Sequence, residues 1–218
     1  MTGATAEQQL KFLHDLQTIL DGGQFVASYK FALLISLADI SVECAPSVDG
    51  TLRIALNQLS ERFIEVYWRQ AAPFLGKEPL WQNTGTQAAI ISTIAGLRES
   101  AGTFAQARRS RKWPSLVKRA REILIDQPLW RLQRLGPQTL ACFYDQQIND
   151  DAIVLKSGVA ACFRALYGTV QAIVQLAWIR YVQKLPRNQA LIGSGHDVAD
   201  FLFGADRSVL TPLREGLA

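Results

Sequence analysis

Seven lysine and arginine residues lie within the fourteen positions of RRSRKWPSLVKRAR, residues 108–121, and this stretch contains no acidic residue. Clustered cations of this kind bind phosphates, although they also occur on the solvated face of an ordinary helix. The wider stretch from Phe104 to Arg134 has nine basic and two acidic residues, a net charge of +7. The rest of the chain has fourteen basic and seventeen acidic residues, a net charge of −3. The positive charge is therefore local, which favours an anionic partner over a generally basic surface.

The segment that begins at Trp113-Pro114 is predicted to be an amphipathic helix, because proline is favoured in the first helical turn. Its two sides over residues 113–125 would differ, with Lys118, Arg121 and Ile125 on one and Leu116, Val117, Ala120 and Leu124 on the other. Four cations precede its N-terminus, where the helix dipole favours anions: Arg108, Arg109, Arg111 and Lys112. Trp113 has two interpretations, an aromatic surface that stacks on a nucleobase or a lid packed against the helix.

The chain has only two histidines, His14 and His196. His14 lies on a predicted amphipathic helix, and we expect it at the surface or at the boundary of the core. His196 precedes Asp197 near a predicted helix start, where the aspartate is a suitable cap. This pair could bind a metal or act as a base, but no third ligand is near it in the sequence. A structural role is therefore the preferred interpretation for both histidines.

Two pairs of carboxylates are spaced by one helical turn: Asp39 with Glu43, and Glu61 with Glu65. Two acids on one helix face can hold Mg²⁺, but solvated faces or arginine partners such as Arg62 and Arg69 are the preferred interpretation. The sequence contains no GxSxG nucleophile elbow, no phosphate-cradling loop and no dinucleotide fingerprint. We therefore predict neither a catalytic residue nor a metal site within this chain.

The composition is that of an ordered globular protein, with 49% hydrophobic and 19% charged residues over 218 positions. Cys44, Cys142 and Cys162 are far apart and embedded in apolar sequence, so we predict reduced core residues of a cytoplasmic protein. There is no Cys-x-x-Cys pair that could bind zinc.

Two apolar segments, residues 25–42 and 165–179, raise the question of a membrane span. Lys30 and Asp39 interrupt the first, and the second is shorter than the roughly 20 apolar residues that a span needs. The N-terminus also lacks a signal-peptide pattern. Both segments are therefore predicted to be buried helices, and no membrane association is expected.

Helical periodicity dominates the chain, so we predict a mainly α fold: one compact multi-helix domain over residues 1–218 with at most a small β-hairpin. The helices are expected near residues 6–20, 28–44, 57–72, 86–100 and 113–125, and short strands near 52–56 and 150–158. The longest element, residues 158–185, is predicted to be one helix with a sustained packing stripe. The stripe consists of Val159, Phe163, Leu166, Val170, Ile173, Ala177 and Tyr181.

Several strings occur together in order: YKFALLISLADISVE, ERFIEVYWRQAAPF, LWQNTGTQAAIIS, PLWRLQRLG and GVAACFRALYGTVQAIVQLAWIRYVQKLPRNQALIG, followed by DVADFLFG. In this order and spacing they resemble the N-terminal helical region of a group of bacterial HNH endonuclease-domain proteins. The likeness spans about residues 10–216.

The resemblance implies a ββα-metal nuclease module after this region, with a Cys-x-x-Cys zinc knuckle and histidine and asparagine residues that hold a divalent metal. The present sequence contains no Cys-x-x-Cys pair and no histidine-rich ending, so no catalytic residue of that module maps onto it. A fragment and a naturally shortened homologue both fit, and the ending DRSVLTPLREGLA favours a fragment. Divalent metal and structural zinc are therefore expected in the module and no cofactor in this chain.

The first functional hypothesis is a DNA-binding or target-recognition domain of an HNH endonuclease in restriction or anti-phage defence. Its candidate nucleic-acid contacts are Arg108, Arg109, Arg111, Lys112, Trp113, Lys118, Arg119, Arg121, Arg131 and Arg134. The alternative is a regulatory or oligomerisation module of such a nuclease that does not contact DNA, with a partner surface on helices 25–44 and 157–185. A self-contained enzyme is a third, less favoured hypothesis.

Overall fold

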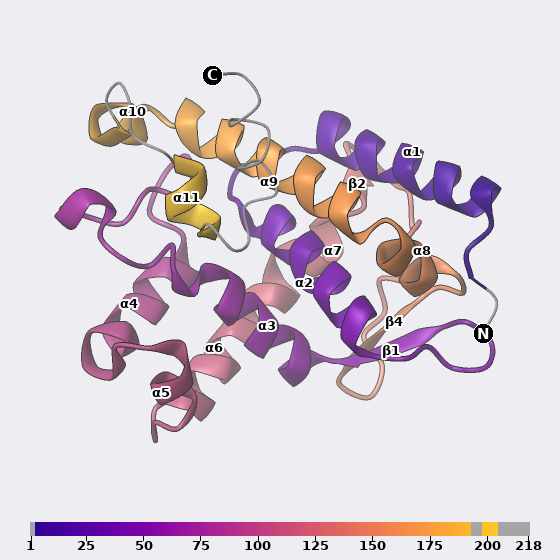
Figure 1. Ribbon diagram of the computed structural model, residues 1–218, viewed down its shortest axis with the longest axis horizontal. Coiled ribbons are helices and arrows are strands. Elements are labelled where there is room, and N and C mark those ends of the chain that lie inside the picture. Colours follow the sequence, from indigo (N-terminus) through magenta and orange to yellow (C-terminus); the bar gives the residue numbers. More distant parts are fainter. Residues whose placement is uncertain (1–2, 193–197, 205–218) are drawn as a thin grey trace.

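The computed structural model describes residues 3–192 and 198–204, and these residues form a compact, mainly α fold (Figure 1). The predicted fold class is confirmed. The helices in chain order are α1 (Ala6–Gly22), α2 (Tyr29–Glu43), α3 (Leu56–Trp68), η1 (Phe74–Gly76), α4 (Ala89–Ala101), α5 (Phe104–Arg108), α6 (Trp113–Asp126), α7 (Pro128–Arg131), α8 (Val159–Ala165), α9 (Tyr167–Lys184), α10 (Pro186–Ile192) and α11 (Val198–Phe203).

Helix α2 lies in the centre of the molecule and packs against α3, α7, α8 and α9 (Figure 1). Every residue from Tyr29 to Ser41 is buried, as the apolar sequence of this segment predicts. Helix α3 lies between α2 and α6, so α6 is attached to the body of the protein by its apolar side. The core is therefore organised around α2, and the basic segment lies outside α3.

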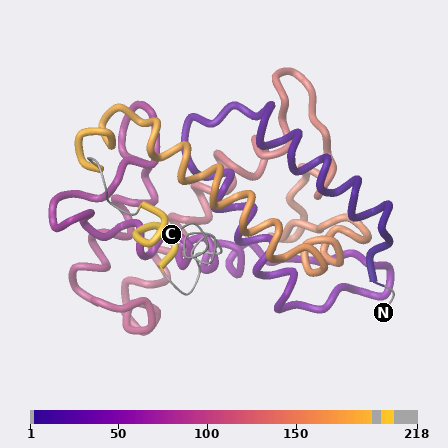
Figure 2. Tube along the Cα trace, turned by 45° about the horizontal axis from the view of Figure 1, so that its top comes forward, coloured from indigo at the N-terminus to yellow at the C-terminus, as the bar shows by residue number. Residues whose placement is uncertain are grey.

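The strands form two small antiparallel pairs. β1 (Leu52–Ala55) pairs with β4 (Ala152–Leu155), and Leu52 lies opposite Leu155. β2 (Arg134–Leu135) and β3 (Gln138–Thr139) form a hairpin, and this hairpin lies beside α1 (Figure 2). The β1–β4 pair joins segments about a hundred residues apart, a contact that periodicity does not predict.

The predicted continuous helix over residues 158–185 is wrong, because the chain bends by 84° between α8 and α9. Each half is fixed separately to α2. The Arg164 guanidinium of α8 donates hydrogen bonds to the carbonyl oxygens of Ser41 and Cys44 at the C-terminus of α2, 2.8 Å each. Tyr167 at the start of α9 donates to the Asp39 carboxylate at 2.8 Å. Two anchoring points on one helix end require the chain to turn between them.

The bend also changes which residues of α9 are buried. Val174, Trp178 and Val182 lie in the core with Val170, whereas Ile173 of the predicted stripe is 39% exposed. Among the described residues no single helix is long and apolar enough to cross a membrane; only α8 and α9 taken together, across their bend, reach the required length and apolarity.

Candidate anion-binding site

Helix α6 begins at Trp113 with a proline in its first turn, as predicted, and Leu116, Val117, Ala120 and Leu124 are buried. The basic residues lie on its outer side and in the turn that precedes it. Four of them are exposed and have no carboxylate or side-chain hydrogen-bond partner among the residues that the structure describes: Arg109, Arg111, Lys112 and Lys118. We call these four residues the basic face. Arg111 and Lys112 directly precede the N-terminus of α6, where the helix dipole adds to their positive potential.

Three predicted contact residues are instead paired with acids. Arg108 binds Glu61 at 2.9 Å, Arg119 binds Glu122 at 2.8 Å, and Arg121 binds Asp151. Arg121 joins α6 to the segment that leads into β4. Their charge is partly neutralised inside the molecule, so a phosphate would have to compete with an existing carboxylate. The continuous cationic run of the sequence is therefore divided in space.

Trp113 is a packed lid, the second of its two interpretations. Its side chain is only 7% exposed, and its ring makes an edge contact with Phe104 at a centroid distance of 5.5 Å. Its indole Nε1 donates to a Glu61 carboxylate oxygen at 3.4 Å. The indole face is consequently unavailable for stacking on a nucleobase, and we remove Trp113 from the candidate contacts.

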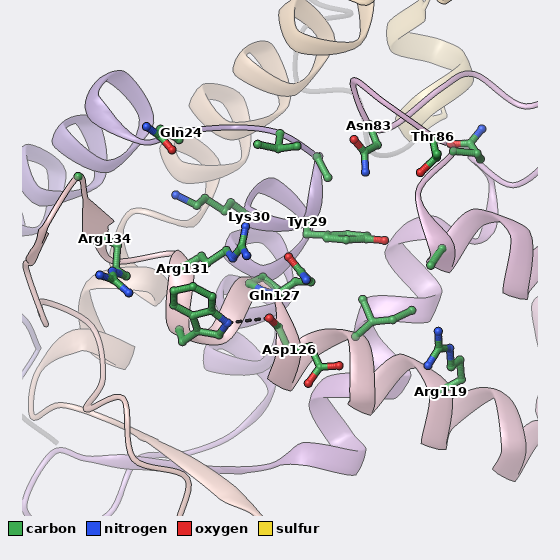
Figure 3. A pocket seen from close by; sticks show the side chains of 18 residues that line it. Gln24, Tyr29, Lys30, Asn83, Thr86, Arg119, Asp126, Gln127, Arg131 and Arg134 are labelled. Carbon is green, nitrogen blue, oxygen red and sulfur yellow. Dashed lines mark hydrogen bonds between the residues drawn. The ribbon is translucent and has the colours of Figure 1, made fainter.

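A pocket of about 630 Å³ lies beside α6, with walls from α2, α4, α6 and α7 (Figure 3). Arg131 and Arg134, the last two predicted contacts, line this pocket, and Arg119 contributes from α6. Figure 3 shows Lys30, Arg131 and Arg134 gathered on one side, and Thr86 and Arg119 on the other. The structure thus separates the predicted residues into a basic face and a cationic pocket, with Arg119 between them.

Lys30 is the pocket residue that sequence reasoning missed. It lies on the central helix α2 with only 6% of the residue exposed. Its amine lies 5.1 Å from the centre of the Phe25 ring, and no hydrogen-bond acceptor or carboxylate in the described chain contacts it. Burial, and secondly the charge of Arg131, lower the pKa of Lys30 to about 8. The signal in the sequence was a lone lysine inside an otherwise apolar helix.

Gly23 allows the chain to pass close to this amine. A Cβ at position 23 would lie 2.4 Å from the Ile19 carbonyl oxygen, 3.0 Å from the Phe25 ring and 3.3 Å from the Lys30 amine. Only glycine therefore fits where α1 ends and the chain turns over Lys30. The next residue, Gln24, lines the pocket.

Arg131 and Arg134 lie over the indole ring of Trp130, with centroid distances of 4.6 and 5.2 Å. Such cation–π contacts contribute about 0.5–1 kcal/mol each at exposed sites and hold the guanidinium groups in place. Trp130 is itself held by a 2.6 Å hydrogen bond from its Nε1 to the Asp126 carbonyl oxygen. Neither arginine has a carboxylate partner in the described part of the chain, so both positive charges remain available to a ligand.

Gln133 positions this arginine-bearing segment. It is fully buried, and its amide oxygen accepts hydrogen bonds from the backbone N–H groups of Phe143 at 2.7 Å and Tyr144 at 3.3 Å. Its amide nitrogen donates to the Tyr144 carbonyl oxygen at 2.9 Å. One glutamine side chain therefore replaces a strand partner for residues 143–144 and fixes the chain between Arg131 and Arg134.

The opposite end of the pocket is formed by Tyr29 and the beginning of α4. Burial raises the pKa of the Tyr29 hydroxyl, and the backbone amides of Ile90 and Ala89 partly oppose that rise. These are the first amides of α4, and they lie beside the hydroxyl. Asn83 and Thr86 add polar groups to the same wall (Figure 3). This end offers hydrogen-bond donors, and its one cation, Arg119, is paired with Glu122.

The acidic pairs considered from the sequence are held by an arginine. Arg62 forms ion pairs with Glu43 and with Glu65 at 2.8 Å, and lies 3.9 Å from Asp39. Asp39 also accepts hydrogen bonds from Tyr167 and Gln171. In residues 3–192 and 198–204 no group of three or more His, Cys, Asp or Glu side chains could hold a metal ion. His14 is exposed on α1, and His196 lies outside the described residues.

The apolar helices proposed as a partner surface lie mainly in the core of the monomer. The exposed apolar residues on them are Val26 at 53%, Val42 at 45%, Tyr167 at 37% and Ile173 at 39%. The basic face and the pocket are therefore the two features whose chemistry is directed at a ligand.

A family model described as a domain of unknown function, DUF8808, matches residues 8–202. The chain belongs to this family. The matched residues include the elements from α2 to α10 and most of α1 and α11, and so both the basic face and the pocket. Neither a curated protein nor a solved structure matches the chain.

Proposed function

We propose that this domain binds nucleic acid through its basic face, as the DNA-recognition part of an HNH endonuclease in restriction or anti-phage defence. The proposal includes a cytoplasmic location. The divalent metal and the structural zinc would be held by a separate nuclease module, because this domain contributes the binding surface and not the catalytic residues. The similarity of its sequence strings to the helical region of HNH proteins supports this part of the proposal.

The observation that carries the proposal is the absence of carboxylate partners around the basic face in the described structure. Arg109, Arg111, Lys112 and Lys118 are exposed, whereas Arg108, Arg119 and Arg121 are paired. Unpaired cations in the turn before α6 and on α6 itself release counterions when they meet phosphates, which provides sequence-independent affinity for a nucleic-acid backbone. Ser115, one turn before Lys118 and Arg119, is exposed as well and adds a hydroxyl donor for phosphate oxygens.

The test is fluorescence polarisation with labelled duplex and single-stranded DNA at 50 and 200 mM salt. About four phosphate contacts give a slope of log K against log salt near −3.6, a loss of roughly 150-fold in affinity between the two salt concentrations. Replacing all four residues of the basic face by glutamine is expected to remove most of this salt dependence. No binding at 50 mM salt, or binding unaffected by the fourfold substitution, would contradict the proposal.

A matched control removes the same number of exposed cations elsewhere on the molecule. Lys77, Arg180, Lys184 and Arg187 are all exposed and distant in sequence from the basic face. Their replacement by glutamine lowers the net charge equally, so this variant is expected to keep the wild-type salt slope within about one unit. Equal loss in both variants would mean that net charge alone attracts DNA. Light scattering of the same samples tests the alternative, a dimeric module without DNA affinity.

A further inference from the structure

The pocket between α2, α4, α6 and α7 contains cations that the basic face does not use. Lys30, Arg131 and Arg134 come from α2, α7 and β2, and none of them has a carboxylate partner in the described part of the chain. The one acid in the lining is Asp126. Figure 3 shows its carboxylate apart from the Lys30 amine. The three bases therefore form a concentrated positive potential in a concave site.

Lys30 provides the strongest indication of a ligand. Lys30 as a residue is 6% exposed, and its amine opens onto the pocket without a hydrogen-bond acceptor in the described part of the chain. Partial desolvation of this ammonium group has a cost, and the contact with the Phe25 ring replaces only part of its hydration. A second cation, Arg131, adds repulsion. The same position could hold a methionine without that cost. A bound dianion would remove both penalties, because it would accept hydrogen bonds from the amine and neutralise the neighbouring guanidinium groups.

The remaining walls suit a flat, polar organic group. Trp130 and Tyr29 supply aromatic surface, and Gln24, Asn83 and Gln127 supply amide groups that can donate to and accept from ring heteroatoms. The volume of about 630 Å³ lies within the range of roughly 300–1,000 Å³ that small-molecule sites occupy. The end with three unpaired cations and the opposite end, where Arg119 is paired with Glu122, thus match the phosphate and the base of one ligand.

We propose that this pocket binds a nucleoside monophosphate, with the phosphate at Lys30, Arg131 and Arg134 and the base toward Tyr29 and Asn83. Arginine provides planar, bidentate hydrogen bonding to phosphate, and the lysine adds a point charge. The base is recognised by amides and aromatic surface. This site is distinct from the basic face. The nucleotide-binding proposal can therefore fail while the proposed nucleic-acid binding holds, and the reverse is also true.

The experiment is isothermal titration calorimetry on the full chain with adenosine, guanosine, cytidine and uridine 5′-monophosphates, each in turn. At least one is expected to bind, and its parent nucleoside and inorganic phosphate are expected to bind at least tenfold more weakly. Absence of binding by all four nucleotides would overturn the proposal. Inorganic phosphate that binds as tightly as the nucleotides would overturn the assignment of the base.

Two variants locate the ligand. Arg131→Gln changes an exposed side chain and is expected to preserve the fold, and Lys30→Met replaces the amine at the pocket by an apolar side chain of similar length. Each is expected to weaken nucleotide binding at least tenfold, and the control Lys77→Gln, at an exposed lysine outside both sites, is expected to leave it unchanged. Wild-type affinity in Arg131→Gln would place the nucleotide elsewhere and overturn the proposal.

The monophosphate can belong to a free nucleotide or to the 5′-phosphorylated end of a strand. Competition with short oligonucleotides, with and without a 5′-phosphate, distinguishes these sources in the variant that lacks the basic face. Displacement by the phosphorylated oligonucleotide alone identifies a strand end as the ligand. If neither oligonucleotide displaces the bound nucleotide, and the nucleotide still binds, the ligand is the free nucleotide.

Discussion

The Lys30 amine and the Arg131 guanidinium face the same pocket, where burial first and the charge of Arg131 second lower the pKa of Lys30 to about 8. Lys30 comes from the central helix and Arg131 from a four-residue helix that follows α6. Two cations without a carboxylate between them are an unfavourable arrangement in a ligand-free protein. The following predictions test this pair and the structure that supports it.

The stability of the ligand-free protein is expected to depend on pH through Lys30. Its pKa is lower in the folded chain, about 8, than the ordinary value of 10.5, so the unfolded chain binds more protons between these values. Stability therefore rises with pH across this window, by about 1 kcal/mol, because solvent at the pocket mouth screens the partly accessible amine. Lys30→Met lacks this contribution, and we expect it to exceed the wild type in stability at pH 7 by a margin that shrinks toward pH 10.5. Urea unfolding of both proteins at several pH values measures the difference, and parallel pH profiles would contradict it.

Gln133→Leu is expected to destabilise the protein by about 3 kcal/mol, because two backbone N–H groups and one carbonyl lose a buried partner. The exposed Gln138 on the adjacent strand is the control, and Gln138→Ala should change stability by less than about 0.5 kcal/mol. Thermal and urea unfolding provide the measurement. Equal stability of the two variants would show that the Gln133 bonds do not hold the segment between Arg131 and Arg134.

Trp113→Phe is expected to leave the affinity for DNA within about twofold of the wild type, since the indole is packed on Phe104 and not exposed. The loss of the Nε1 bond to Glu61 should cost about 1 kcal/mol of stability. In the same polarisation assay, replacement of Lys112 by glutamine should weaken binding and lower the salt slope by about one unit. A large loss of affinity in Trp113→Phe would restore the stacking interpretation.

Arg62→Met should destabilise the protein by about 2 kcal/mol, because Asp39, Glu43 and Glu65 lose their common cation. Asp39 is 8% exposed, so its desolvated carboxylate is the costliest of the three to leave without that charge. Lys118→Met removes an exposed cation without a carboxylate partner and is expected to be neutral within about 0.5 kcal/mol. Calorimetric unfolding of both variants measures the difference. An Arg62→Met variant as stable as the wild type would mean that the ion pairs of Arg62 do not stabilise the fold.

Local sequence patterns were sufficient for the elements whose signals are strong and continuous. The uninterrupted apolar run of α2 predicted its burial, and the Trp113-Pro114 start with its apolar side predicted α6. The long helix over residues 158–185 was not predicted correctly, because its bend depends on Arg164 and Tyr167 binding α2, more than a hundred residues earlier. Periodicity describes how a segment packs but contains no information about such distant partners.

The sequence by itself determined that the positive charge is local and that it lies on and around one amphipathic helix. Only the tertiary structure decided which cations are available, because Glu61 and Asp151 come from elsewhere in the chain to pair with Arg108 and Arg121. It also brought Lys30 of the core helix to Arg131, which changed a lysine that merely interrupts an apolar run into a pocket residue. Charge is a property of composition, whereas pairing and desolvation depend on distances that only the folded chain establishes.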